Sequence, residues 1–211
     1  MIPAREALQR LREGNRRFVS GVLSTETQLK PERRAELAKS QEPFAIILGC
    51  SDSRVPAELV FDQGLGDLFV IRVAGNVVAP SQIGSVEFGA VYAGCRLVVV
   101  LGHTQCGAIQ ATLDALQQPD ANSSRNLRSI VDRVRPSIEG LLSTNLREQP
   151  DLLKALAVRA NVGVSVSHLR HGSELLERMI DREGLLVVGA EYSLETGVVE
   201  FFDEGKAESQ S

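Results

Sequence analysis

Short apolar runs alternate with longer stretches of helical periodicity along this chain. Five runs, rich in Val, Ile and Leu, predict strands over residues 44–48, 67–74, 97–101, 185–191 and 198–202. Apolar runs without polar interruption are typical of strands that are buried on both faces of a parallel sheet. The turn Glu195-Thr196-Gly197 separates the last two runs, so we expect the fifth strand to be antiparallel to the fourth.

Apolar residues spaced three or four apart predict helices between these strands. The expected helices cover residues 3–19, 31–40, 56–61, 81–94, 107–116, 122–143, 150–169 and 173–183. Ser81 is a candidate cap for the fourth of these helices, and Pro136 predicts a kink or break in the sixth.

The alternation of strands and helices indicates an α/β fold. We expect a mainly parallel central β-sheet, with four parallel strands plus an antiparallel edge strand, flanked by helices. The 211 residues fit a single domain, 1–211, in which residues 1–40 form an N-terminal helical arm and residues 205–211 a disordered tail.

Composition narrows the class of protein. Hydrophobic residues make up 43% of the chain and charged residues 24%, and the net charge of -4 is spread without a block of one sign. These values are ordinary for a globular protein and give no sign of a nucleic-acid groove. The chain shows neither a signal peptide nor a membrane-spanning run, so we expect a cytoplasmic protein. Three cysteines in a reducing compartment favour metal binding or catalysis over disulfides.

Metal-type ligands follow two of the predicted strands. The first strand ends at Gly49 and is followed by Cys50, and the third ends at Gly102 and is followed by His103 and Cys106. Three protein ligands plus one exchangeable position is the pattern of a catalytic zinc site. Two buried cysteines with an ordinary histidine are the alternative interpretation, but the repeated plan of the two strand ends favours a metal.

Asp52 is a fourth candidate at this centre. It could coordinate zinc, or it could stand beside a zinc-bound water and accept its proton. Arg54 lies two residues further along, so in an extended segment both side chains face the same way and can form an ion pair. Such pairing would lower the pKa of Asp52 and draw it away from the metal. An ordinary surface ion pair is the alternative.

The two motifs together resemble a known family. Cys50-Ser51-Asp52-Ser53-Arg54 and His103-Thr104-Gln105-Cys106-Gly107 are similar to the two signature motifs of the β-class carbonic anhydrases. The resemblance implies one zinc ion per chain, held by Cys50, His103 and Cys106, with Asp52 and Arg54 as a catalytic dyad. It also implies a homodimer or a dimer-based tetramer with active sites at the subunit boundary.

The resemblance carries further positions over one by one. Gln41 matches a glutamine that hydrogen-bonds substrate, reaching it from the partner subunit. Phe69, Ala74 and Phe88 match an apolar substrate pocket, and Gly107 matches a glycine whose N–H approaches substrate. Taken without the family, the two phenylalanines would be assigned to the core and Gln41 to a loop.

The implied reaction is the reversible hydration of carbon dioxide to bicarbonate and a proton, by attack of zinc-bound hydroxide on carbon dioxide. Some relatives close their site when bicarbonate binds a tryptophan–arginine–tyrosine cluster elsewhere. Arg72 matches that arginine, but Ile47 stands at the tryptophan position. We therefore predict an open site, with Asp52 paired to Arg54 and no bicarbonate-driven cooperativity. For His168 and His171 a surface or capping role is favoured over proton shuttling, and Cys95 is interpreted as a buried apolar residue.

Three alternatives stay open at this point. A thiol phosphatase would use Cys50 and Arg54, but the three residues between them include Asp52 and make a poor phosphate cradle. A non-enzymatic zinc protein would not need the dyad. Hydrolysis of carbon disulfide or carbonyl sulfide, known among relatives of the family, depends on access to the pocket, which the sequence does not show.

Overall fold

A five-stranded sheet forms the centre of the fold. A computed structural model describes residues 2–24, 31–118 and 124–203 of the chain, and the expected tail at 205–211 lies outside them. The strands are β1 (Ala45–Gly49), β2 (Leu68–Arg72), β3 (Leu97–His103), β4 (Leu186–Tyr192) and β5 (Val199–Phe202). They lie in the order β2-β1-β3-β4-β5, with β5 antiparallel to β4 and all other pairs parallel. The sequence-based prediction of this sheet is confirmed.

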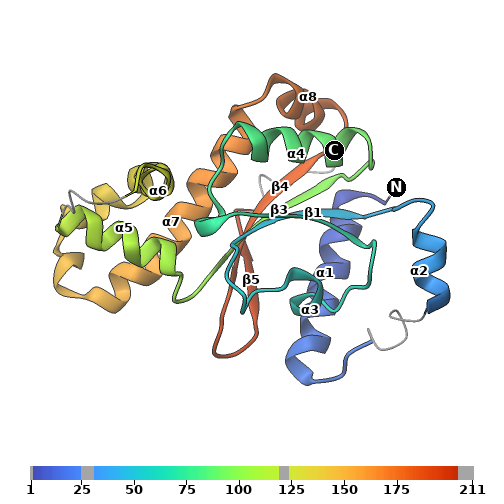
Figure 1. The fold of residues 1–211 in the computed structure, drawn as a ribbon, viewed down its shortest axis with the longest axis horizontal. Helices are drawn as coiled ribbons and strands as arrows, with labels where there is room; N and C mark the ends of the chain where they lie inside the picture. Colours follow the sequence, from blue (N-terminus) through green and yellow to red (C-terminus); the bar gives the residue numbers. More distant parts are fainter. Residues whose placement is uncertain (1, 25–30, 119–123, 204–211) are drawn as a thin grey trace, which may run out of the picture.

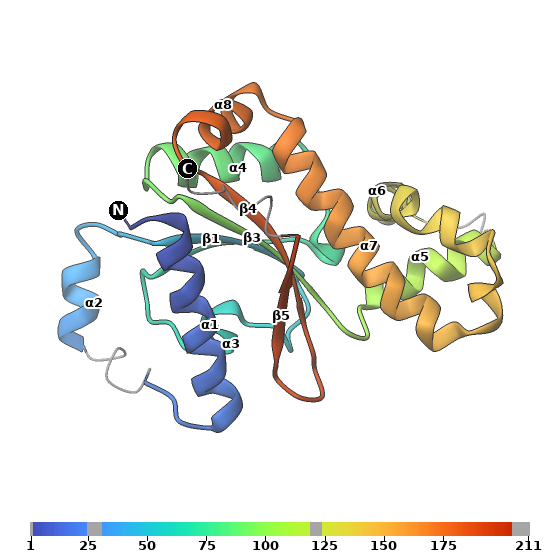
Figure 2. The same cartoon turned by 180° about the vertical axis from the view of Figure 1, so that it is seen from behind.

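Helices cover both faces of the sheet (Figures 1 and 2). On one face lie α1 (Ala4–Ser20) and the short α3 (Ala57–Val60), packed on odd-numbered residues of β1 and β3 such as Ile47 and Val99. On the other lie α4 (Pro80–Val91), α7 (Pro150–His171) and α8 (Glu174–Arg182), packed on even-numbered residues such as Ile46 and Val98. The alternation of side chains along each strand thus supplies two apolar faces.

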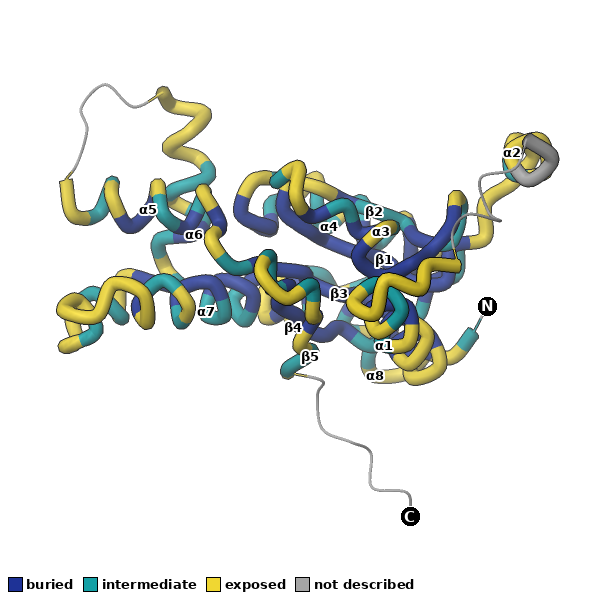
Figure 3. Tube along the Cα trace, turned by 90° about the horizontal axis from the view of Figure 1, so that it is seen from below, coloured by how far each residue is buried: buried dark blue, intermediate teal, exposed yellow. Residues whose placement is uncertain are grey.

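A helical extension lies beyond the carboxyl ends of the strands. It consists of α5 (Gly107–Gln117), α6 (Arg125–Leu142), the 3-10 turn η3 (Asn145–Glu148) and the first half of α7. Figure 3 shows these helices projecting from the sheet with exposed outer surfaces and buried inner ones. Their inner surfaces form a third apolar cluster that includes Val134, Ile138 and Leu153, and also Cys50 and Cys106. The remaining helix, α2 (Pro31–Leu37), precedes β1.

Two details of the helices differ from the sequence-based prediction. The sequence predicts a kink or break at Pro136, but Pro136 lies inside a continuous α6, so the break is wrong and the kink stays a prediction. Val134 and Ile138, on either side of the proline, are both buried in the third cluster, and their packing offsets the hydrogen bond that proline cannot make. Helix α4 begins at Pro80 without a side-chain cap, so Ser81 lies in its first turn, because proline suits the first helical position. No helix in the described ranges has the length and apolarity needed to cross a membrane.

Helix α1 is attached both to the end of α3 and to the β4–β5 hairpin. Its buried Asn15 donates hydrogen bonds to the carbonyl oxygens of Val60 and Gly197, at 3.0 and 2.9 Å, and accepts one from the Val199 N–H at 2.9 Å. Gly14 allows the close approach, since a Cβ there would lie 1.8 Å from the carbonyl oxygen of Phe61. One buried amide therefore joins α1, the end of α3 and the β4–β5 hairpin.

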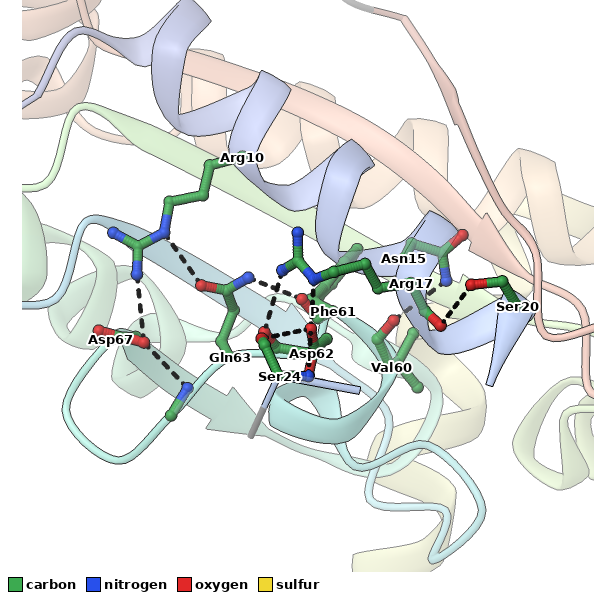
Figure 4. Close-up of polar contacts among 11 residues, drawn as sticks. Arg10, Asn15, Arg17, Ser20, Ser24, Val60, Phe61, Asp62, Gln63 and Asp67 are labelled. Carbon is green, nitrogen blue, oxygen red and sulfur yellow. Dashed lines mark hydrogen bonds and ion pairs between the residues drawn. The ribbon is translucent and has the colours of Figure 1, made fainter. Parts of the chain in front are cut away.

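Charged side chains complete this attachment (Figure 4). Asp62 is buried in a left-handed conformation and accepts hydrogen bonds from Arg17 and from the hydroxyl and N–H of Ser24. Arg10 reaches Gln63 at 3.1 Å and Asp67 at 3.2 Å. Arg10 and Arg17 of α1 thus bind the loop that connects α3 to β2. These two arginines have a structural role in addition to keeping the outer face of an amphipathic helix in water.

Candidate metal centre

Three buried side chains meet at the carboxyl ends of β1 and β3. Cys50 follows the last residue of β1, His103 is the last residue of β3, and Cys106 is the N-cap residue of α5. Since β1 and β3 are adjacent and parallel, their carboxyl ends lie at one edge of the sheet. The two sulfur atoms and a ring nitrogen of His103 all lie within 4.8 Å of one another. The sequence-based expectation that folding joins these residues is confirmed.

The segment between His103 and Cys106 is held by the neighbouring strand. The Thr104 N–H donates to the carbonyl oxygen of Tyr192, and the Thr104 hydroxyl accepts a hydrogen bond from the Leu194 N–H, both at 3.0 Å. Gln105 takes a left-handed conformation with φ of 56°, which reverses the chain and starts α5 at once. The side chains of His103 and Cys106 are thereby turned toward one point.

The ring of His103 is oriented for ligation. Its Nδ1 lies 2.8 Å from the carbonyl oxygen of Thr104, which makes Nδ1 the protonated nitrogen. Its Nε2 is buried and has no hydrogen-bond partner among the described residues. Burial alone would lower the pKa of His103, but the Cys50 thiolate and then the Thr104 carbonyl outweigh burial and raise it. The lone pair of His103 Nε2 therefore faces two cysteine sulfurs, and this electron-rich arrangement favours binding of a cation.

The two cysteines differ in their surroundings. Cys50 Sγ interacts with the Cys106 thiol, with His103 and with the Gly75 N–H at 3.4 Å, which together overcome burial and lower the pKa of Cys50 to about 4. The adjacent Cys50 thiolate, followed by burial, raises the pKa of Cys106. The two sulfurs therefore influence each other strongly, and a divalent ion between them would favour the thiolate form of both.

Asp52 lies at the edge of this cluster and is turned toward Arg54. The Arg54 guanidinium donates from Nη2 to Asp52 Oδ2 at 2.7 Å and from Nε to Oδ1 at 2.9 Å, and the Arg54 N–H adds a third bond at 3.0 Å. These bonds hold the pKa of Asp52 well below its usual range. Asp52 Oδ2 is also 3.9 Å from His103 Nε2. The predicted pairing of Asp52 with Arg54 is confirmed.

Arg72 supports the same loop from behind. Its Nε donates to the carbonyl oxygen of Cys50 at 3.0 Å and its Nη2 to that of Asp52 at 2.6 Å. Arg72 is the last residue of β2 and lies level with Gly49. Sequence reasoning considered this arginine only as part of an anion site and missed the contacts. The register of β2 against β1, which a single sequence does not give, decides them.

The remaining predicted site residues fall into two groups. Ala74 and Gly107 adjoin the cluster, beside Gly75 and Cys106 respectively, and both are exposed. Phe69 is level with Ile46 on β1, four residues before Cys50, which places it about 13 Å back along the strand.

Phe88 stacks on Phe69, with ring centroids 6.1 Å apart, and is half-exposed. Gln41 is exposed before β1 begins, in a groove lined by Leu37 and Gly66. One chain therefore does not bring Gln41, Phe69 or Phe88 to its own cluster.

The other histidines and the third cysteine lie outside this centre. His168 and His171 are exposed in the last turn of α7, where they line a pocket of about 300 Å³ together with Arg133. Both histidines are thus at the surface, and their predicted surface or capping role, in preference to proton shuttling, stays a prediction. Cys95 is buried with its thiol 3.2 Å from the carbonyl oxygen of Pro43, and burial raises its pKa to about 11. Its interpretation as a small core residue is confirmed.

Comparison with known proteins points to one family. The sequence model of the carbonic anhydrase family matches residues 45–199. A carbonic anhydrase of Mycolicibacterium smegmatis is 40% identical over 195 residues, which cover 92% of this chain and 91% of that protein. Carbonic anhydrase 2 of Mycobacterium tuberculosis is 38% identical over 196 residues, with 90% and 89% covered.

Solved structures agree with the sequences. The crystal structure of a β-carbonic anhydrase of Aspergillus fumigatus superposes with a TM-score of 0.74 at 27% identity, covering 84% of each chain. A β-carbonic anhydrase of Coccomyxa, solved in complex with acetazolamide, gives a TM-score of 0.72 at 25% identity and covers 90% of this chain and 83% of its own. With both signature motifs assembled at one sheet edge, this chain belongs to the carbonic anhydrase family of enzymes, in its β-class.

Proposed function

We propose that this enzyme hydrates carbon dioxide to bicarbonate and a proton at one zinc ion per chain, held by Cys50, His103 and Cys106. The observation that supports the zinc site is the buried, unpartnered Nε2 of His103, which lies within 4.8 Å of two cysteine sulfurs. Two thiolates and an imidazole are ligands that zinc prefers, and three protein ligands leave one position for water or substrate.

The surrounding residues have distinct tasks in this proposal. Zinc, when bound, supplies a Lewis acid that lowers the pKa of water from about 16 toward 7. Asp52 Oδ2 would accept a hydrogen bond from that water and take its proton only in passing, because the low pKa of Asp52 keeps the carboxylate ionised at neutral pH. Arg54 holds Asp52 in a two-point contact and so keeps the carboxylate off the metal. Arg72 fixes the backbone that carries both Cys50 and Asp52.

A second copy of the chain would complete the substrate pocket. Gln41, Phe69 and Phe88 lie away from their own cluster, at the sheet edge formed by β2. Phe69 is in β2, Phe88 stacks on it, and Gln41 shares a groove with Gly66 just before β2. Tyr92, which is 78% exposed, packs at a tilt against Phe88, with ring centroids 4.8 Å apart, and extends an aromatic surface there. Among the described strands β2 is the edge of the sheet, and a strand edge next to exposed aromatic rings suits a subunit interface. We therefore propose a homodimer, or a tetramer built from dimers, in which these residues face the partner's zinc.

A metal-analysed hydration assay tests the proposal. The purified protein should contain one zinc per chain and should hydrate carbon dioxide in a stopped-flow assay with a pH indicator, and chelation should abolish both. Cys106→Ser should lose most zinc and activity, whereas Cys95→Ser removes an equally buried thiol outside the centre and should keep both. Full zinc occupancy in Cys106→Ser would contradict the ligand assignment. Turnover of carbon disulfide or carbonyl sulfide but not of carbon dioxide would contradict the substrate.

The ligands also favour a compartment. Cys50 and Cys106 act as ligands only while they are reduced, and all three cysteines are free. A reducing cytoplasm keeps thiols in that state, so we propose that the enzyme works there.

A further inference from the structure

A tight turn lies between the metal centre and α7. This turn, η2 (Ala74–Asn76), has two consecutive left-handed residues, with φ of 66° at Gly75 and 43° at Asn76. The Gly75 N–H donates to Cys50 Sγ at 3.4 Å. On its other side the turn packs closely on α5, since a Cβ on Gly75 would lie 3.0 Å from the Cβ of Ala108. Small movements of η2 would therefore change the hydrogen bond between the Gly75 N–H and Cys50 Sγ.

Two side chains of α7 hold this turn in place. Asn161 Nδ2 donates to the carbonyl oxygen of Gly75 at 2.8 Å, and Ser165 Oγ donates to that of Asn76 at 3.0 Å. Both side chains are buried, and their four-residue spacing places them on one face of the helix. Gly75 and Asn76 are buried too, so without these donors their carbonyl oxygens would lose partners that water cannot replace.

We infer that Asn161 and Ser165 are positioning residues for the metal centre: they hold η2 so that the Gly75 N–H points at Cys50 Sγ. Neither residue belongs to the proposed ligand set or the dyad. They act through the backbone of Gly75, whose N–H withdraws electron density from the thiolate and fixes the direction of its lone pairs. Loss of such an outer hydrogen-bond partner typically costs 10–100-fold in metal affinity. The inference rests on the proposed zinc site and adds the helix that orients one of its ligands.

Two variants of α7 and one matched control test this inference. Asn161→Ala and Ser165→Ala each remove one donor to the turn, and Ser165→Ala deletes only a hydroxyl group, so it remains decisive if Asn161→Ala fails to fold. Asn15→Ala is the control, because Asn15 is also a buried asparagine that donates to two backbone carbonyl oxygens, but in α1. All four proteins are prepared with zinc bound, and the rate of zinc transfer to a chromogenic chelator is measured.

We expect zinc release to be about tenfold faster or more in Asn161→Ala, and several-fold faster in Ser165→Ala. In cobalt-substituted samples the thiolate-to-cobalt charge-transfer band should move to lower energy in both, because a sulfur that loses a hydrogen bond becomes a better donor. Asn15→Ala should lower the melting temperature but keep the zinc release rate and the cobalt spectrum of the parent.

Three outcomes would count against the inference. Parent-like zinc release and cobalt spectra in both α7 variants would overturn it while leaving the zinc site intact. If Asn15→Ala changed the zinc release rate and the cobalt spectrum as much as the α7 variants do, any loss of stability would be sufficient to loosen the metal. That result would also overturn the inference. A parent protein that binds no zinc would overturn the proposed function itself, and this inference with it, so the two failures are distinguishable.

Discussion

Replacing Gly102 with alanine should destabilise the enzyme, whereas the same replacement at Gly49 should not. Gly49 is the last residue of β1 and Gly102 the last but one of β3, and each directly precedes a proposed zinc ligand. A Cβ on Gly102 would lie 2.5 Å from Val162 Cγ2 and 3.4 Å from Val158 Cγ1, both on α7. A Cβ on Gly49 would meet nothing closer than the carbonyl oxygen of Leu101 at 3.9 Å. The two positions look alike in sequence but differ in the space around them.

The packing gives the size of the effect. Carbon atoms pack at about 3.5–4.0 Å, so the contact at Gly102 falls short by about 1.0–1.5 Å. A valine in a helix has one strongly preferred rotamer, so Val162 cannot turn aside and α7 must shift. Overpacking of this kind costs about 1–3 kcal/mol. Alanine recovers about 0.5–1 kcal/mol over glycine in a strand, which reduces the loss at Gly102 and gives a net gain at Gly49.

Thermal unfolding of the two variants provides the measurement. For a chain of this length 1 kcal/mol shifts the melting temperature by about 2–4 °C. We expect Gly102→Ala to melt several degrees below the parent and Gly49→Ala at or slightly above it, with all samples at equal protomer and zinc concentrations, because ligands and association also shift melting. Equal melting temperatures for the two variants would refute the argument that α7 is in hard contact with β3.

Four further results should follow from the site and from the attachment of α1. Asp52→Asn should keep its zinc but lose about 10²–10⁴-fold in hydration rate, because an amide cannot accept the proton; metal analysis and stopped-flow rates check both. Arg54→Ala should also lose activity, since it frees a carboxylate that already lies 3.9 Å from His103 Nε2, and parent rates in both variants would remove the dyad from catalysis. The pKa of Asp62 in the folded protein is lowered below its ordinary value of 3.8. The ionised carboxylate therefore contributes its full share of the folding stability above pH 3.8, and this share is lost as the pH falls through the folded-state pKa. Asp62→Asn should therefore be less stable at pH 7 and show a shallower loss of stability below pH 3.8 in an acid unfolding titration. Inhibition of hydration by bicarbonate should be hyperbolic, because the side chain of Ile47 has no N–H to donate to an anion at a second, non-catalytic site. Steep cooperative inhibition would contradict this prediction.

The strands and the proposed ligands were predictable because each depends on local sequence. An apolar run such as residues 97–101 is sufficient to indicate a buried strand, and a glycine followed by Cys50 or His103 marks its carboxyl end. The continuous α6 was not predictable, since the packing that offsets Pro136 is made by distant helices.

The residues that support the site were harder to find for the same reason. Asn161, Ser165 and Arg72 donate to backbone carbonyl oxygens, and every residue of a chain has one. Which carbonyl a side chain reaches depends on strand register and helix placement rather than on a motif. The roles of Gln41 and Phe88 are harder still to predict from the sequence, because in our proposal these residues line the pocket of a second copy of the chain.

The attachment of α1 has a consequence for synthesis on the ribosome. Asn15 is bonded to Val199, 184 positions later, so this hydrogen bond of α1 cannot form until the intervening chain has emerged from the ribosome. At about 5–20 residues per second this delay lasts about 10–40 s. During that time α1 can already pack on β1 and β3, which are made earlier, but the β4–β5 hairpin that Asn15 binds is missing. The buried amide of Asn15 therefore keeps some of its hydrogen bonds unmade until the β4–β5 hairpin has been synthesised.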